Sequence, residues 1–266
     1  MKKILFIGIS LLALSVYADD DIEEIVVKGK VLYSDQVNAL RTPTAIVDVP
    51  QAVSIVTDED IRKQGIRSIG DIVRYTPGVN TSQGEGHRDA VVFRGVRSTA
   101  DFFQDGARDD VQYYRSLYNV EQVEVLRGPN ALLFGRGGTG GIINRVTKKA
   151  TIGENFGSFD LGADSFGASD FAVDYNMELG DNSAIRLNAH VDALENHRDF
   201  YDGDRTGFNP TLRVELSDST TLDLSYEYAD HERFIDRGIP TANGVPVEAL
   251  KNVVFGTSDI LSLIHI

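Results

Sequence analysis

The glycines within residues 135–140 have the spacing of a phosphate-binding loop, G-x-G-x-x-G. Such a loop binds a dinucleotide when a strand precedes it and a helix follows it, because the helix N-terminus meets the pyrophosphate. Here residues 130–134 predict a helical turn before the glycines, and residues 142–146 predict a strand after them. No Lys-Ser or Lys-Thr pair follows, so the P-loop pattern fails as well. A glycine loop packed in a confined space is therefore the better interpretation.

Residue types suited to catalysis or metal binding are sparse. The 266 residues contain no cysteine, which excludes disulfides and thiolate metal sites. His87 and His197 have no second ligand at metal spacing, and we interpret both as polar loop residues. No nucleophile is placed beside a base, and the Asp109-Asp110 pair falls in an acidic loop that we expect to be exposed. We therefore predict no enzyme activity, no metal site and no cofactor.

The N-terminus has the pattern of a secretory signal peptide. Lys2 and Lys3 precede an apolar run over residues 4–16, and small Ala18 follows. This run is shorter than the about 20 residues of a membrane-spanning helix. We therefore expect residues 1–18 to be removed, which would change the net charge from −14 to −16 because two lysines are lost. A chain with this negative charge repels the phosphate groups of nucleic acids, so we exclude nucleic acid as a partner.

Residues 19–49 lack helical periodicity and predict a mobile segment. Within it, residues 22–27 form a short apolar island. Two interpretations stay open from the residues alone. The island is either an edge strand of the following domain or an extended peptide that a partner captures by strand addition.

Residues 50–150 predict one compact domain with helices and short strands. Thr57 with Asp60 has the spacing of a capping box, and Gly65 ends the helix that the box begins. Ser68 and Asp71 repeat the cap for a second helix. The expected strands are residues 53–56, 91–96, 122–126 and 142–147.

Beyond residue 150 the apolar residues alternate with polar ones, which indicates strands with one apolar and one charged face. The short connections at 180–183 and 217–220 alternate with longer ones at 195–207 and after 230. A soluble antiparallel sheet also alternates, but runs of about 10 residues with alternating loop lengths are typical of outer-membrane barrels. The five expected strands are residues 158–164, 171–179, 185–193, 212–216 and 222–228.

Five strands cannot close a membrane sheet, because a spanning sheet has no open edge. We therefore expect residues 151–266 to be the first part of a larger barrel and the chain to be a fragment. Residues 261–266 follow a long loop, do not extend the charged alternation and lack the terminal aromatic residue on which outer-membrane barrels usually end. We therefore expect either that the chain is truncated or that its last residues are not native.

Residues 121–135, followed by 140–144, resemble the plug signature of TonB-dependent receptors. Other plug landmarks occur in the family's order at residues 49–53, 76–79 and 93–95, with Asp105-Gly106 behind them. Residues 101–106 and 113–115 resemble siderophore receptors, especially those of the catecholate type. The apolar island resembles the TonB box, Ile22, Glu23, Glu24, Ile25, Val26 and Val27.

The resemblance implies an α+β plug inside a transmembrane β-barrel, 22-stranded in the family, in the outer membrane of a Gram-negative bacterium. The implied partners are TonB with its inner-membrane energising complex, a ferric siderophore, and outer-membrane lipid with lipopolysaccharide. The siderophore fills the iron coordination sphere, so no protein ligand to iron is expected. Haem or cobalamin is the alternative cargo. A signalling or adhesion surface is the other alternative, although only residues 19–21 separate the signal peptide from the box.

Three plug loops, residues 83–89, 97–102 and 109–115, resemble the family's ligand-facing loops. Arginines there suit an anionic ferric catecholate, and tyrosines suit stacking on its rings, while pairing of the arginines with neighbouring carboxylates is the structural alternative. The candidate ligand-binding residues are His87, Arg88, Ser98, Thr99, Phe102, Tyr113, Tyr114 and Arg115.

A further set of motif residues is expected to have a structural role in the plug. We predict that Arg127, Arg136 and Arg145 face carboxylates of the barrel wall, such as Asp174 or Glu178, in buried ion pairs. The candidate structural residues are Arg94, Gly95, Arg127, Gly128, Pro129, Gly135, Gly140 and Gly141.

Overall fold

The computed structural model describes residues 36–40, 44–82, 86–130, 134–135, 138, 140–198, 200–253 and 261–265. The predicted signal peptide, the predicted TonB box and Arg136 lie outside these residues. We call the described residues from 36 to 150 the plug. We call the sheet formed by the later strands the strand wall.

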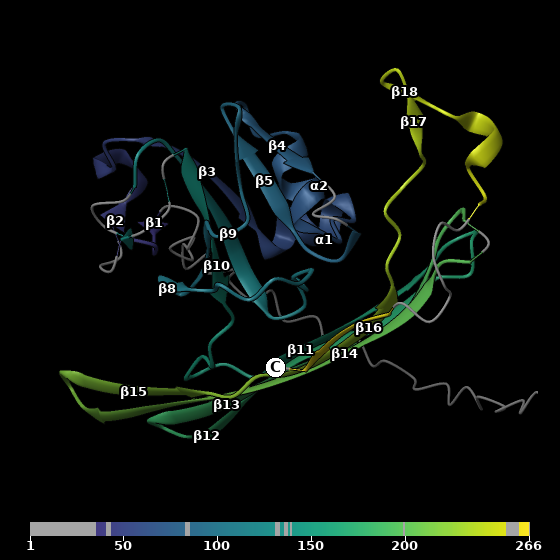
Figure 1. Cartoon of the computed structure of the whole chain (residues 1–266). Helices are drawn as coiled ribbons and strands as arrows, with labels where there is room; N and C mark the ends of the chain where they lie inside the picture. The colour runs from purple at the N-terminus through teal and green to yellow at the C-terminus, as the bar shows by residue number, and fades with distance from the viewer. Residues whose placement is uncertain are drawn as a thin grey trace, which may run out of the picture. The chain divides into compact units, whose positions relative to one another are not determined.

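A five-stranded sheet forms the centre of the plug. Its strand order is β3-β9-β10-β7-β8, with β10 parallel to β7 and the other pairs antiparallel. In Figure 1, β3, β9 and β10 run side by side as the sheet order requires. The strands are β3 (Ala52–Thr57), β7 (Phe102–Gln104), β8 (Ala107–Arg108), β9 (Val120–Arg127) and β10 (Gly141–Thr147).

The two predicted helices are present, and the predicted caps begin them. The Thr57 hydroxyl accepts from the Asp60 amide, and the Asp60 side chain accepts from the Thr57 amide, before α1 (Asp58–Gln64). Gly65 ends α1 with a left-handed φ of 62°. Ser68 caps α2 (Ile69–Arg74), because its hydroxyl accepts from the Asp71 amide, while the Asp71 carboxylate accepts from the Arg67 amide. The prediction from cap spacing is therefore confirmed for both helices.

A second sheet of the plug contains β4 (Val79–Ser82), β5 (Ala90–Phe93) and β6 (Val96–Ser98). The single strand expected at residues 91–96 is therefore wrong. Arg94 and Gly95 have φ values of 47° and 88°, and they form a two-residue hairpin turn in which Phe93 pairs with Val96. Near the N-terminus, β1 (Gln36–Val37) pairs with β2 (Thr44–Ala45), and a 3-10 helix spans Ile46–Asp48.

Two apolar clusters hold the plug together. The larger one joins both helices to the sheets, with Ile69, Phe93 and Val125 among its fully buried members. The smaller one lies at the N-terminal side and includes Val37 and Ala39, which are fully buried although they belong to a short segment. This second cluster packs the first described residues of the plug against its central sheet.

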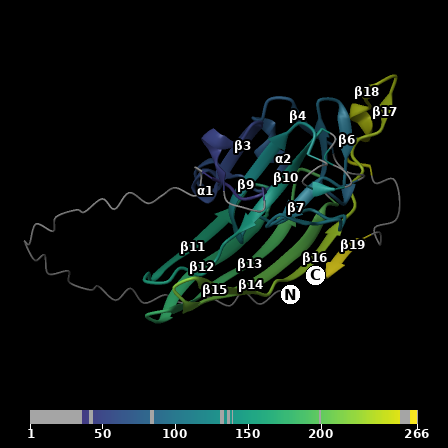
Figure 2. The ribbon, with the colours of Figure 1, turned by 90° about the vertical axis from the view of Figure 1, so that its left-hand side faces the viewer.

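The strand wall contains seven strands in the order β11-β12-β13-β14-β16-β19, with β15 also paired to β14. Figure 2 shows β11 to β16 as neighbours in this order. All pairs are antiparallel, and the described path is open at both edges. The strands are β11 (Phe156–Ala163), β12 (Ser169–Gly180), β13 (Ser183–Glu195), β14 (Asp202–Ser217), β15 (Thr220–Ser225), β16 (Tyr228–Phe234) and β19 (Leu261–His265).

Two strand predictions need correction, and one strand was not predicted. The strand expected at 212–216 begins at Asp202, so only residues 196–201 connect it to β13. The strand expected at 222–228 breaks between β15 and β16, which pair with different halves of β14. Residues 261–265 do extend the sheet, because they pair with β16. Beyond β16, the chain forms β17 (Thr241–Ala242), β18 (Val245–Pro246) and a 3-10 helix (Glu248–Leu250).

The strand wall has its apolar face outside. Along β12 and β13, polar Asp174, Asn176, Arg186 and Asn188 are buried, whereas large apolar side chains are exposed. This is the reverse of a soluble sheet, and it is the pattern of a strand whose apolar face meets lipid. Exposed members of the apolar face include Phe159, Leu161, Phe171, Tyr175, Met177, Leu179, Leu222, Leu224 and Tyr228. In the described part of the chain, no helix has the length and apolar character needed to cross a membrane.

Candidate functional site

The arginine expected to bind ligand, Arg115, lies at the centre of a buried polar cluster. It is only 2% exposed, and its Nε lies 2.8 Å from Asp109 Oδ2. Its Nη1 lies 3.6 Å from Asp89 Oδ2, and its guanidinium stacks 3.9 Å from the centre of the Phe102 ring. Burial raises the pKa of the Asp89 carboxyl, and the Arg115 cation opposes this shift only in part.

Arg145 completes the same cluster from strand β10. Its Nη2 lies 2.9 Å from Asp109 Oδ2 and donates to the Tyr113 hydroxyl at 2.9 Å. The Tyr113 hydroxyl donates in turn to Asp109 Oδ2 at 3.1 Å. Burial raises the pKa of Tyr113, so its phenol stays a donor. Two arginines and a tyrosine therefore converge on one carboxylate.

This geometry divides the candidate ligand residues into two groups. Phe102, Tyr113 and Arg115 are buried, and their polar groups have partners inside the plug. For these three residues the structural alternative explains the contacts. The half-buried candidates are His87, Arg88, Ser98, Thr99 and Tyr114.

Arg88 and Tyr114 supply a cation and an aromatic ring, and the ring of Tyr114 contacts the strand wall. Arg88 Nη1 donates to Gln112 Oε1 at 2.7 Å and lies 3.1 Å from His87 Nε2. The Arg233 guanidinium of β16 lies 4.3 Å from the centre of the Tyr114 ring. Burial raises the pKa of Tyr114 to about 12, and Arg233 opposes this shift. This group is the part of the predicted site that keeps exposed surface.

The predicted pairing of motif arginines with wall carboxylates is wrong for the two that the structure describes. Arg127 donates to the Pro77 carbonyl at 3.1 Å and to Ser54 Oγ at 3.0 Å, both in the plug. Arg145 pairs with Asp109, also in the plug. Sequence spacing identified charged motif residues, but it carries no information on which carboxylate each one meets.

The predicted tight packing of the glycine loop is found at Gly140 and at the adjoining Gly141 of β10, but not at Gly135, where an added Cβ would meet no atom within 4 Å. A Cβ at Gly141 would lie 2.5 Å from the Leu126 carbonyl oxygen and 2.6 Å from the Phe93 ring. A Cβ at Gly140 would lie 2.6 Å from Phe93 Cβ. Only glycine permits this close approach of β10 to its neighbours.

A buried ion network joins the plug to the strand wall. Lys148 Nζ lies 3.3 Å from Asp58 of α1 and 3.0 Å from Asp174 of β12. Arg186 of β13 binds both oxygens of Asp174 at 2.7 Å, and it also lies 3.4 Å from Glu121 of β9. The wall carboxylate was therefore predicted correctly as an anchor, although its partner is Lys148. The only sequence signal for Lys148 was a cation directly after a motif strand.

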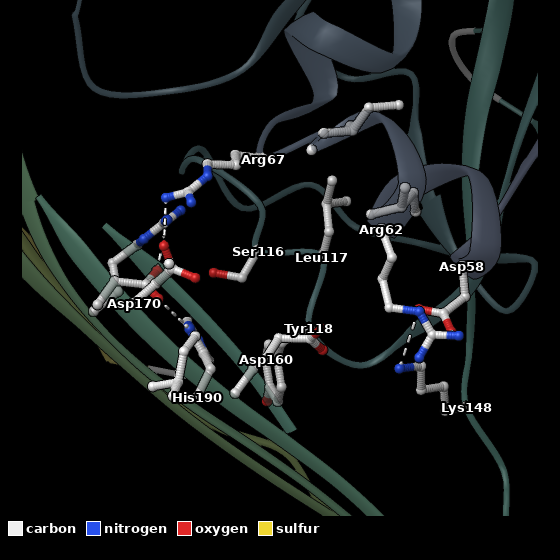
Figure 3. A pocket seen from close by; sticks show the side chains of 18 residues that line it. Asp58, Arg62, Arg67, Ser116, Leu117, Tyr118, Lys148, Asp160, Asp170 and His190 are labelled. Carbon is white, nitrogen blue, oxygen red and sulfur yellow. Dashed lines mark ion pairs between the residues drawn. The ribbon is translucent and has the colours of Figure 1, made fainter. Parts of the chain in front are cut away.

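Further contacts line the boundary between the plug and the wall. Figure 3 shows Arg67 facing Asp170 across the cleft, with an ion pair of 2.5 Å. Deeper in the same cleft, the Tyr118 ring stacks on the His190 ring at 4.2 Å. Elsewhere, Glu227 accepts from Gln104 and from Asn119, each at 3.0 Å. The plug thus covers the polar face of the strand wall.

Comparison with known sequences identifies the plug. The family model described as TonB-dependent Receptor Plug Domain matches residues 45–142. The probable TonB-dependent receptor BfrD of Bordetella pertussis is 33% identical over 209 residues, which are 76% of this chain and 28% of that protein. The catecholate siderophore receptor Fiu of Escherichia coli K12 is 29% identical over 229 residues, 81% of this chain and 29% of that protein. The chain spans less than a third of the length of these relatives.

Solved structures share both the plug and the wall. The siderophore receptor PiuA from Acinetobacter baumannii aligns with a TM-score of 0.73 and 27% identity, over 81% of this chain and 33% of that one. The open form of the ferric-catecholate import receptor Fiu from Escherichia coli K12 aligns with a TM-score of 0.68 and 27% identity, over 75% of this chain and 30% of that one. The shared region comprises an α+β plug and antiparallel strands that follow it.

Proposed function

Because the chain belongs to the TonB-dependent receptor family, we propose that the protein imports a ferric siderophore with energy supplied through TonB. One observation carries this proposal. A sheet with its apolar face outside buries its polar face against a plug, which suits a gated passage through a lipid bilayer.

The outer membrane of a Gram-negative bacterium is the location of this family, and its members are transporters rather than enzymes. The exposed rings and aliphatic side chains of β11, β12 and β15 suit contact with lipid. Because an outer membrane has no nucleotide supply, the work of import has to arrive mechanically. A strand-forming peptide ahead of the plug provides a place where a partner can pull.

Two features support a siderophore as the cargo. Receptors named for siderophores, Fiu and PiuA, are among the relatives in both sequence and structure. The half-buried Arg88 and Tyr114 offer a cation and a ring, the chemistry that an anionic ferric catecholate needs. In this proposal the siderophore supplies every iron ligand, and the plug recognises the outside of the complex.

Growth under iron limitation tests the proposed cargo. A strain without its own siderophore receptors would express the gene that encodes the chain and receive one iron-loaded siderophore at a time. We expect growth on at least one ferric catecholate and none in a matched strain without TonB. Growth on haem alone, or equal growth without TonB, would contradict the proposal.

A further inference from the structure

Glu124 is a buried carboxylate that neither the ion network nor the ligand loops use. It lies at the middle of β9 and is fully buried. Five hydrogen bonds from described residues reach its two oxygens, and all five come from uncharged donors. Burial of a carboxylate among uncharged donors costs free energy. We therefore infer that this side chain has a specific role in the plug.

Three of the five bonds come from residues 38 and 39, which lie 85 or more positions away in sequence. The Asn38 amide donates to Oε1 at 2.6 Å, and the Ala39 amide donates to Oε2 at 2.9 Å. The Asn38 side chain adds a bond of 3.3 Å to Oε1. Glu124 therefore accepts hydrogen bonds from the backbone of residues 36–40, which we call the entry segment.

Among the described residues, the entry segment makes three further kinds of contact with the plug. Its ladder with β2 consists of two residue pairs, Gln36 with Ala45 and Val37 with Thr44. Gln122 donates to the Gln36 carbonyl at 3.2 Å, and Val37 and Ala39 enter the smaller apolar cluster. Loss of Glu124 would leave the part-buried Asn38 amide and the buried Ala39 amide without the acceptor that Glu124 provides, which weakens the attachment of the segment.

The remaining two hydrogen bonds connect Glu124 to residues of β9 and β10. Gln122 and Asn144 donate their side-chain amides to Glu124 at 2.7 and 3.0 Å. Asn144 Oδ1 in turn accepts from the Gly106 amide at 2.9 Å, in the turn between β7 and β8. Each carboxylate oxygen thus accepts from both sides, Oε1 from Asn38 and Gln122 and Oε2 from Ala39 and Asn144.

We propose that Glu124 is a latch that fastens the entry segment to the rest of the plug, and that its bonds to Asn38 and Ala39 break before β3 is displaced when the chain ahead of the entry segment is pulled. This inference rests on the proposed function, because the pulled peptide is the predicted TonB box at residues 22–27. The load from that peptide reaches the entry segment before it reaches β3. The bonds at Asn38 and Ala39 are short-range contacts, so a small displacement of the segment breaks them.

Cysteine labelling measures the latch without any transport. None of the 266 residues is cysteine, so an introduced thiol is the only one among them, and its labelling is read from the proteolytic peptide that carries it. Val37→Cys places a smaller side chain at a fully buried position of the entry segment, and Val73→Cys does the same in α2. Each thiol is combined with Glu124→Gln, which keeps the side-chain shape but offers one acceptor oxygen and turns an NH2 group toward donors. The matched control is Glu59→Gln, an exposed carboxylate of α1.

The maleimide labelling rate is then measured on the intact protein in outer membranes from cells that lack TonB. We expect Glu124→Gln to raise labelling at residue 37 by at least about tenfold and to leave residue 73 unchanged. Glu59→Gln should change neither rate. An unchanged rate at residue 37, or an equal rise at both residues, would overturn the latch. Because no TonB is present, neither result depends on whether the protein imports a siderophore.

Discussion

Lys148 Nζ lies 3.0 Å from Asp174 Oδ2, so the chain that leaves the plug is joined to the strand wall by a buried ion pair. Arg186 binds the same carboxylate through both of its oxygens. The position of α1 depends on this pair as well, because Lys148 also contacts Asp58. Asp174 is thus the carboxylate of the wall at which a cation of the plug and a cation of the wall meet.

Replacement of Asp174 with Asn should weaken this attachment strongly. Two buried cations, Lys148 and Arg186, would lose the carboxylate they share and keep only the carboxylates of Asp58 at 3.3 Å and Glu121 at 3.4 Å. Removal of one partner from a buried pair costs about 3–5 kcal/mol. Asp223→Asn is the matched control, because Arg213 binds Asp223 with the same bidentate geometry at an exposed position, where a pair is worth about 0–1 kcal/mol. Thermal unfolding of the protein in outer membranes measures both variants. Equal loss of stability in the two variants would contradict the assignment of Asp174 as an anchor.

The capping box of α1 should contribute a measurable part of plug stability. Thr57→Ala removes the acceptor for the Asp60 amide and should cost about 1 kcal/mol. Thr81→Ala is the control, since the exposed Thr81 hydroxyl donates only a weak bond of 3.3 Å to Ser82. The midpoint of thermal unfolding should fall for Thr57→Ala and stay within error for Thr81→Ala. No difference between the variants would show that packing alone fixes the start of α1.

Asp89 predicts a pH dependence with a definite sign. Burial raises its pKa in the folded protein above the unfolded value near 3.8. Below the unfolded pKa both states carry the proton, so the cost of burying the charge is absent. As the pH rises through the folded pKa the folded protein loses the proton, and stability falls.

Comparison with Asp89→Asn, which cannot titrate, isolates this effect. The stability of the unsubstituted protein relative to Asp89→Asn should increase as the pH is lowered from about 8 toward about 4. Unfolding midpoints at a series of pH values provide the measurement. A relative stability that decreases on acidification would show that the Arg115 pair, rather than burial, dominates at Asp89.

The proposed ligand group predicts a selective loss of binding. Arg88→Ala removes the half-buried cation beside Gln112, and a charge-assisted contact of about 1.5–3 kcal/mol corresponds to a loss of about tenfold or more in affinity. Arg74→Ala is the control, because Arg74 is an exposed cation of α2 on the same domain. Binding of a ferric catecholate to cells without TonB separates affinity from import. Equal affinity of the two variants would remove Arg88 from the ligand site.

Local signals in the sequence predicted local structure well. The spacing of Thr57 and Asp60 determined the start of α1, because a capping box involves only neighbouring residues. Alternation along β12 and β13 predicted which side chains face lipid, because the side-chain period of a strand is two. The turn between β7 and β8 was not predicted, although positive φ at Asp105 and Gly106 is what an Asp-Gly pair between short strands favours.

Partners distant in sequence could not be predicted in the same way. Nothing local distinguishes Arg115, which is buried against Phe102, from Arg88, which keeps exposed surface. Lys148 and Asp174 meet only because the plug and the wall fold against each other. The break between β15 and β16 depends on where each half pairs along β14. In each case the tertiary arrangement decides which contact forms.

Uptake of radiolabelled iron from a ferric siderophore tests the central claim most directly. Ile25→Pro removes a strand donor from the predicted TonB box, and Asp21→Pro makes the same substitution just outside it. We expect Ile25→Pro to bind the ferric siderophore normally and to reduce uptake to the level of cells without TonB, while Asp21→Pro takes up iron like the unsubstituted protein. Full uptake by Ile25→Pro, or uptake by the unsubstituted protein in cells without TonB, would contradict TonB-coupled import.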